Sequence, residues 1–182
     1  MNTVQPIRDS ELVNAIAEDL KENNERDYVM FMTGIYLGLR ISDILKLKVK
    51  DLKKTHINIR AQKTGKETRI LINATLRKAI DDYIKNSNLK DNNYLFVSKT
   101  KRYKPITREQ AYKILNKIGK KYKLESIGTH TLRKTFGYHF YKQKGDVAML
   151  QTLFGHDNQN DTLRYIGMIQ DTIDTNLKNF KI

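Results

Sequence analysis

The chain has 182 residues, of which 39% are hydrophobic and 30% charged, with only 2 proline and 9 glycine residues. This composition is typical of one globular domain, and it excludes a disordered or collagen-like chain and a second large domain. Lys and Arg outnumber Asp and Glu by 34 to 20, and the resulting net charge of +14 favours a polyanionic partner, with nucleic acid the leading class.

Several features of the sequence argue against export or membrane insertion. No apolar run approaches the about 20 residues of a membrane-spanning helix, and residues 1–10 lack the apolar stretch of a signal peptide. The sequence has no cysteine, so it offers no disulfide, no thiolate metal site and no thiol nucleophile. We therefore expect a cytoplasmic protein.

The N-terminal part of the chain predicts two amphipathic helices. Residues 9–10, Asp-Ser, are good N-cap residues, and the apolar residues Leu12, Ile16 and Leu20 follow them at helical spacing. A second helical pattern covers residues 28–39 and ends beside a glycine, which loosens the chain at that point.

A change from helical to alternating periodicity predicts a small β-sheet. A short helical run over residues 42–47 precedes residues 55–61, where apolar and polar side chains alternate as in a strand. A polar turn over residues 62–66 leads to a second strand over 67–72, which completes an antiparallel hairpin. A third short strand is expected at residues 94–97.

The rest of the chain is helical in period. Asn73 begins one helix, and Thr107 with Gln110 has the spacing of a capping box that opens another, to about Tyr122. Further helical patterns cover residues 131–143, 147–154 and 163–166, and an amphipathic tail carries Ile173, Leu177 and Phe180. We therefore expect a mainly α architecture with one small antiparallel β-sheet, an α+β fold.

Four short segments carry the side chains of chemical interest. Arg40 follows an apolar helix within Gly-Leu-Arg-Ile-Ser-Asp. His130 and Arg133 are three residues apart and therefore share a helix face. His156 follows a glycine in a predicted turn, and Tyr165 comes nine residues later. A solvated surface or a packed ring explains each residue taken alone, so the information lies in their order.

The order and spacing of these segments resemble the tyrosine recombinase (phage integrase) family. The resemblance rests on Gly-Leu-Arg-Ile-Ser-Asp, a lysine on the hairpin, His-Thr-Leu-Arg-Lys-Thr-Phe, Leu-Phe-Gly-His and the tyrosine nine residues further on. It runs from about Tyr28 to Gly167, nearly the whole chain, with Phe154 where leucine is more usual. It implies the fold of a recombinase catalytic domain.

The resemblance also implies an activity, that of a site-specific DNA recombinase, or integrase, which needs neither metal nor cofactor. The Tyr165 hydroxyl would attack a DNA phosphodiester, giving a 3′-phosphotyrosyl link and a free 5′-hydroxyl. Arg40 and Arg133 would bind the oxygens of the phosphorane, because planar guanidinium forks match them. His156 would donate a hydrogen bond to a non-bridging oxygen. His130 would accept the tyrosine proton or bind the phosphate, and an ordinary pKa of about 6.5 permits either role.

Other polar residues are assigned supporting roles by the same resemblance. Lys63 on the hairpin would protonate the departing 5′-oxygen; Lys66 on the same turn is the alternative, and the alignment of Gln-Lys-Thr-Gly-Lys-Glu with the family hairpin favours Lys63. Asp43 matches an acidic position of the family and is expected to orient an arginine. The loop residues expected to bind DNA phosphates are Lys99, Lys101, Arg102 and Lys104.

The expected partner is double-stranded DNA, with the protein a monomer when free and a homo-tetramer on DNA. We expect a catalytic domain over residues 1–170 and a C-terminal helix over 171–182 that is exchanged between protomers, although this helix can alternatively fold back on its own core. Family members generally carry a separate N-terminal DNA-binding domain, and we expect none here, because only about 27 residues precede the match. A fragment of a longer integrase and a naturally short member, resembling fimbrial-switch recombinases, both fit.

Two other functions compete with recombination. A non-catalytic DNA-binding module would need phosphate contacts but no positioned tyrosine, so the complete set of catalytic residues disfavours it. A type IB topoisomerase-like enzyme would make the same covalent link without strand exchange, and relaxation of supercoiled plasmid without a specific site would favour it.

Overall fold

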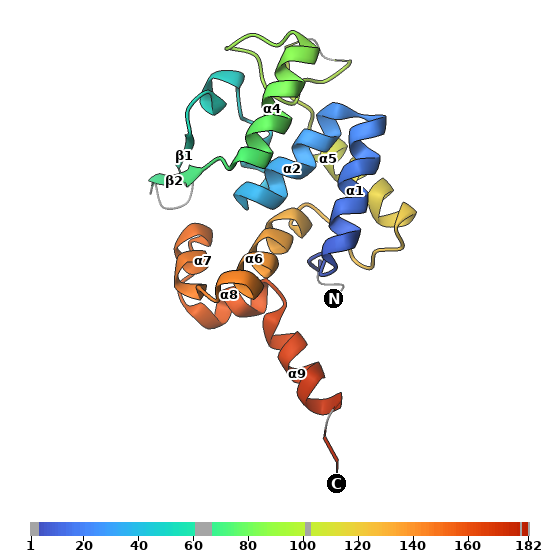
Figure 1. Cartoon of the computed structure of the whole chain (residues 1–182), viewed down its shortest axis with the longest axis vertical. Helices are drawn as coiled ribbons and strands as arrows, with labels where there is room; N and C mark the ends of the chain where they lie inside the picture. Colours follow the sequence, from blue (N-terminus) through green and yellow to red (C-terminus); the bar gives the residue numbers. More distant parts are fainter. Residues whose placement is uncertain (1–3, 61–66, 101–102, 179, 182) are drawn as a thin grey trace.

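The computed structural model describes residues 4–60, 67–100, 103–178 and 180–181. Helices dominate it, with one small hairpin (Figure 1). In chain order the elements are α1 (Ser10–Asn23), α2 (Glu25–Leu37), α3 (Ile41–Ile44), the 3₁₀-helix η1 (Val49–Leu52), β1 (His56–Arg60), β2 (Glu67–Leu71), α4 (Ala74–Ser87), α5 (Arg108–Lys121), α6 (Thr131–Lys144), α7 (Val147–Phe154), α8 (Gln159–Tyr165) and α9 (Met168–Lys178).

The N-terminal helices form where the sequence predicts them. The Asp9 carboxylate accepts hydrogen bonds from the first backbone N–H groups of α1, and the Asn24 side chain caps α2 in the same way. Ile16 and Leu20 on α1 are buried in the main core, which α2 crosses with an almost completely buried face. This core is built from α1 to α5, the hairpin and Leu132 of α6, and the site lies against it.

The structure confirms the predicted hairpin, but residues 94–97 do not form the predicted third strand. β1 and β2 pair antiparallel with Ile57 opposite Ile70, and Ile57 is buried in the main core. Within the described residues, 94–97 form only isolated bridges, Lys48 to Tyr94 and Val97 to Pro105. The consecutive side chains of Leu95 and Phe96 are both completely buried, so this extended segment lies inside the core and not at the edge of the sheet.

Helices α6, α7 and α8 form a second layer beneath the main core (Figure 1). Their small apolar cluster is centred on Leu150, Phe154 and Ile166. Gly38 joins the two layers: it ends α2 with φ +61°, and a Cβ at this position would lie 2.4 Å from the Phe136 ring of α6. Only glycine combines this backbone conformation with such a close approach.

The last helix, α9, leaves the body and projects away from it (Figure 1). The helix has no buried residue, and the apolar side chains of its tail, Ile173, Leu177 and Phe180, are 45%, 66% and 68% exposed. This segment therefore does not fold back on its own core. None of the helices in the described part of the chain has both the length and the apolarity needed to cross a membrane.

Candidate active site

The predicted nucleophile, Tyr165, lies at the end of α8 beside both predicted histidines. Its hydroxyl is 3.1 Å from Nδ1 of His130, which occupies the N-cap position of α6. Its ring packs edge-on against His156 and Phe154, with centroid separations of 5.1 and 5.5 Å. Side chains that are 35 residues apart in the chain, such as His130 and Tyr165, thus meet in one site.

Arg133 lies beneath this cluster and is only 4% exposed. Its Nη1 donates to the Gly38 carbonyl at 2.6 Å, its Nη2 donates to the Phe154 carbonyl at 3.0 Å, and its guanidinium lies 4.3 Å from the centre of the Phe154 ring. Burial lowers the pKa of Arg133 to about 10, so the group remains charged at neutral pH. The arginine thereby connects the ends of α2 and α7 to α6.

His156 is held by a hydrogen bond within the α7–α8 region. Its Nδ1 lies 3.0 Å from the hydroxyl of Thr162, which is completely buried in α8. Because Nδ1 is used in this contact, Nε2 is the ring nitrogen that can serve an external oxygen. Partial burial, reinforced by Arg133, lowers the pKa of His156 and favours the neutral ring.

Arg40 and Asp43 border the same cluster from α3. Arg40 is exposed at the N-cap position of α3, directly after the turn that ends α2. After burial, which acts first, the charge of Arg40 is among the influences that lower the pKa of both site histidines. The half-buried Asp43 carboxylate opposes the effect of burial on the pKa of Arg133. Both residues therefore act electrostatically on the site that the sequence predicts.

The environment of the site favours a protonated Tyr165 and a neutral His130 ring. Burial lowers the pKa of His130, and Arg108, Arg133 and further cations lower it more. Burial raises the pKa of Tyr165, although Arg133 opposes this. A neutral imidazole in contact with a protonated phenol is the arrangement that a proton acceptor needs.

Two residues of the site were not singled out by the sequence analysis. Lys134 is buried, its Nζ donates to the Val4 carbonyl at 2.7 Å, and the same Nζ lies 5.0 Å from the centre of the Tyr165 ring. Thr162, which holds His156, is a helix residue like many others. Lys134 lies within the His-Thr-Leu-Arg-Lys-Thr-Phe motif, but the motif does not indicate its contact with Tyr165, and Thr162 belongs to no motif, so only their neighbours in space reveal these roles.

Several predicted residues are not part of this cluster in the described structure. Lys63 and its alternative Lys66 lie outside the described residues, as do Lys101 and Arg102. Lys99 and Lys104 are both exposed. Among the described residues, no group of His, Asp or Glu side chains is arranged to hold a metal ion.

Comparison with known proteins identifies a family. The phage integrase family matches residues 7–170. A probable integrase/recombinase, YoeC, of Bacillus subtilis (strain 168) is 48% identical over 94% of both chains. The crystal structure of XerA recombinase superposes with a TM-score of 0.75 at 22% identity, over 98% of this chain and 67% of that one. XerH site-specific recombinase bound to its difH substrate superposes with a TM-score of 0.71 at 20% identity, over 91% and 50%.

The extent of these matches differs between relatives. The chain spans nearly the whole of the Bacillus subtilis protein. It spans about half the length of other curated relatives, which are named as tyrosine recombinases. The solved structures share the architecture of this chain, mostly helical with a small antiparallel hairpin, and confirm the predicted fold class.

Proposed function

The chain belongs to the phage integrase family of tyrosine recombinases, and from this membership we propose that it is a site-specific recombinase that cleaves and rejoins DNA through Tyr165. One observation carries the proposal: the Tyr165 hydroxyl lies 3.1 Å from Nδ1 of His130, whose pKa is lowered by burial, beside the buried guanidinium of Arg133. A nucleophile, a base and a fixed cation are the parts that phosphoryl transfer to a side chain requires.

The covalent step begins with the phenol. Tyr165 Oη loses its proton to His130 and forms a bond to phosphorus, while the bond from phosphorus to the 5′-oxygen breaks. The 5′-oxygen takes a proton, and we assign its donor as Lys63, with Lys66 as the alternative on the same turn. The products are a 3′-phosphotyrosyl link and a 5′-hydroxyl, and the reverse step with another 5′-hydroxyl completes strand exchange.

Three further side chains stabilise the charge that develops on the phosphate. Arg133 uses two of its N–H groups on carbonyls and also interacts with Tyr165, and the remaining donors of its fork are proposed to bind non-bridging oxygens. Arg40 approaches from the exposed side, and His156 presents Nε2, which donates in the tautomer whose Nδ1 accepts a hydrogen bond from the Thr162 hydroxyl. Asp43 supports the charge of Arg133. Because Arg133 is already held in place, little reorganisation is needed when the charge appears.

Double-stranded DNA is the proposed partner, and the cytoplasm is the proposed location. The net charge of +14 and the DNA-bound structure of XerH, which shares this fold, support the assignment of DNA. The exposed Lys99 and Lys104 are proposed to contact phosphates, together with Lys101 and Arg102 of the same loop.

Helix α9 is proposed to join protomers into a tetramer on DNA. Its exposed apolar residues and its direction away from the body support a contact with a neighbouring copy. We expect deletion of the residues after Gly167 to abolish synapsis and to leave binding of a single half-site unchanged, because no core residue is lost. Gel-shift assays with one and two sites check this. Recombination at the normal level by the truncated protein would contradict the exchange of α9.

Cleavage should depend on pH through His130. Tyr165 keeps its proton throughout the neutral range because its pKa is raised, so the reaction needs a neutral acceptor. The pKa of His130 is lowered, so the cleavage rate should be flat around neutrality and fall only below about pH 6.5, when the ring is protonated. Single-turnover cleavage rates measured against pH check this. The variant His130→Gln should cleave slowly, and its rate should no longer fall at acidic pH. If the rate of this variant still falls at acidic pH, the fall belongs to the titration of another group.

Trapping of the covalent intermediate tests the proposed function. A nicked suicide substrate carrying the target site should yield an SDS-resistant adduct in the presence of EDTA, linked to the 3′ end of the DNA. Digestion of the adduct should leave the DNA on the peptide that contains Tyr165. A folded protein that binds this substrate without forming an adduct would favour the non-catalytic binding module. Relaxation of plasmids that lack the site would favour the topoisomerase-like activity.

A further inference from the structure

The residues that precede α1 form a segment that is fixed to α6. We call residues 4–8 the N-terminal segment. The backbone N–H of Ile7 donates to the Thr135 hydroxyl at 2.9 Å, and the Ile7 carbonyl lies 2.9 Å from Nε2 of His139. The Ile7 side chain is 3% exposed. The segment therefore has a defined position on the helix that carries Arg133.

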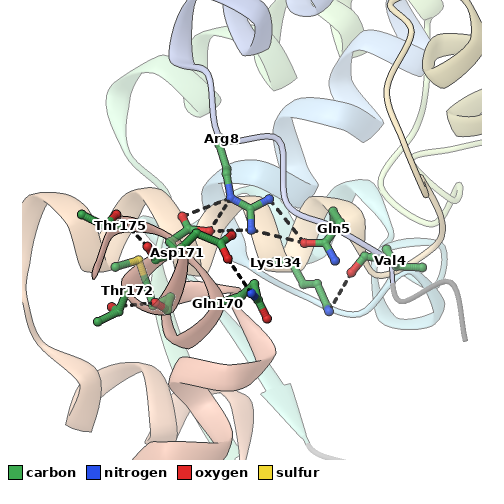
Figure 2. A network of polar contacts seen from close by, with 10 residues as sticks. Val4, Gln5, Arg8, Lys134, Gln170, Asp171, Thr172 and Thr175 are labelled. Carbon is green, nitrogen blue, oxygen red and sulfur yellow. Dashed lines mark hydrogen bonds and ion pairs between the residues drawn. The ribbon is translucent and has the colours of Figure 1, made fainter. Parts of the chain in front are cut away.

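Arg8 of this segment forms an ion pair with Asp171 in the first turn of α9 (Figure 2). Its Nε lies 2.9 and 3.1 Å from the two carboxylate oxygens of Asp171, and its Nη2 lies 2.8 Å from Oδ1. Both Nη atoms also donate to the Gln5 side-chain oxygen at 3.3 Å, and the guanidinium lies 5.6 Å from the centre of the Tyr138 ring. Such a bidentate pair defines a direction as well as a distance.

The same segment is connected to the nucleophile through Lys134. Lys134 donates to the Val4 carbonyl, and its Nζ lies 5.0 Å from the centre of the Tyr165 ring (Figure 2 draws the first contact). Tyr165 and Asp171 are only six residues apart. The N-terminal segment thus contacts the surroundings of Tyr165 through Lys134 and the helix that follows Tyr165 through Arg8.

A glycine lies in the stretch of chain between these two contacts. Gly167 lies between α8 and α9 with φ +88°, and a Cβ at this position would lie 2.9 Å from Nη2 of Arg8. A glycine at such a junction allows the following helix to take many directions, so contacts between α9 and the body, including the packing of Met168 against the small apolar cluster, must select the one that is observed. The Arg8–Asp171 pair is placed to do so.

We propose that Arg8 and Asp171 are positioning residues for Tyr165: the N-terminal segment acts as a brace that holds the direction of α9 and, through it, the place of the nucleophile. The proposal rests on the proposed function, because it concerns the reactive geometry of Tyr165. In-line attack requires reacting atoms to be placed closely, and a misplacement of about 1 Å can slow the chemistry by about 10²-fold. An ion pair that is partly exposed contributes little to overall stability, so rate and stability should separate.

Asp171→Asn is the most informative variant, because it removes the negative charge of the ion pair and leaves Arg8 in place. Removing Arg8 would also remove a cation that could itself attract DNA. We expect single-turnover cleavage of the suicide substrate to slow by on the order of ten-fold, with DNA affinity and melting temperature unchanged. Asp174→Asn is the matched control on the same helix, since Asp174 accepts a hydrogen bond from Gln170 within α9. It should cleave at the normal rate.

Charge exchange tests the pair directly. Arg8→Asp alone should slow cleavage, and the double variant Arg8→Asp/Asp171→Arg should recover most of the lost rate. Equal rates for the wild type, Asp171→Asn and Asp174→Asn would overturn the brace. So would a double variant that is no faster than the single ones.

A second measurement does not depend on catalysis. The chain has no cysteine, so spin labels can be placed at Glu22→Cys on α1 and Asn176→Cys on α9. The distance distribution between them should be narrow in the otherwise unchanged protein and broad with Asp171→Asn. Equal widths would overturn the brace. If the wild type forms no covalent adduct, the proposed function fails, whereas these distributions still decide whether the brace exists.

Discussion

Replacing Tyr165 with phenylalanine should abolish the covalent adduct and leave the folded protein able to bind DNA. The variant loses only the hydroxyl, and with it the hydrogen bond to His130 and the interaction with Arg133. The ring keeps its contacts with Phe154 and His156 and its position under the Lys134 ammonium. The free energy of unfolding should therefore change by no more than about 1 kcal/mol, measured by urea denaturation beside the adduct assay.

A second tyrosine provides the control for this result. Tyr141 packs against the same small apolar cluster as Tyr165 but lies on α6, so Tyr141→Phe makes the same chemical change without touching the proposed nucleophile. It should form adduct at the normal level. Adduct formed by Tyr165→Phe, or lost in Tyr141→Phe with its fold intact, would contradict the assignment of Tyr165.

Replacing Arg133 with methionine should remove both activity and a large part of the stability. The guanidinium satisfies the carbonyls of Gly38 and Phe154, two residues that are buried. An unsatisfied buried carbonyl costs about 1–3 kcal/mol, so the free energy of unfolding should fall by roughly 2–5 kcal/mol. Cleavage should fall by about 10³-fold, because the proposed donor to the phosphorane is lost.

Two further variants separate the structural and chemical roles of Arg133. Arg133→Lys keeps the charge but cannot reach two carbonyls as a fork does, so it should recover part of the stability and little of the rate. Arg40→Met removes an exposed cation of the same site and should slow cleavage with little change in stability. An Arg133→Met protein with wild-type stability would show that the two carbonyls find other partners.

The third strand shows where sequence reasoning failed. Residues 94–97 are apolar enough for a strand, and the pattern predicts an extended backbone, which the structure contains as isolated bridges. The prediction of pairing in the sheet was wrong because Leu95 and Phe96 are both fully buried. A strand at the edge of a sheet with one solvated face would expose one of two neighbours, and a sequence pattern this short cannot distinguish the two cases.

The sequence by itself determined the order of the helices, the hairpin and the family, because periodicity, capping residues and the spacing of short motifs are local properties of the chain. It also singled out Arg40, His130, Arg133, His156 and Tyr165. Only the tertiary structure decided that His130 touches the Tyr165 hydroxyl, that Arg133 is buried between two carbonyls and that α9 points away from the body. The contacts of Lys134 and the Arg8–Asp171 pair were likewise revealed only by the tertiary structure. They join residues distant in the chain, and the packing of the two layers, which no local pattern encodes, brings them together.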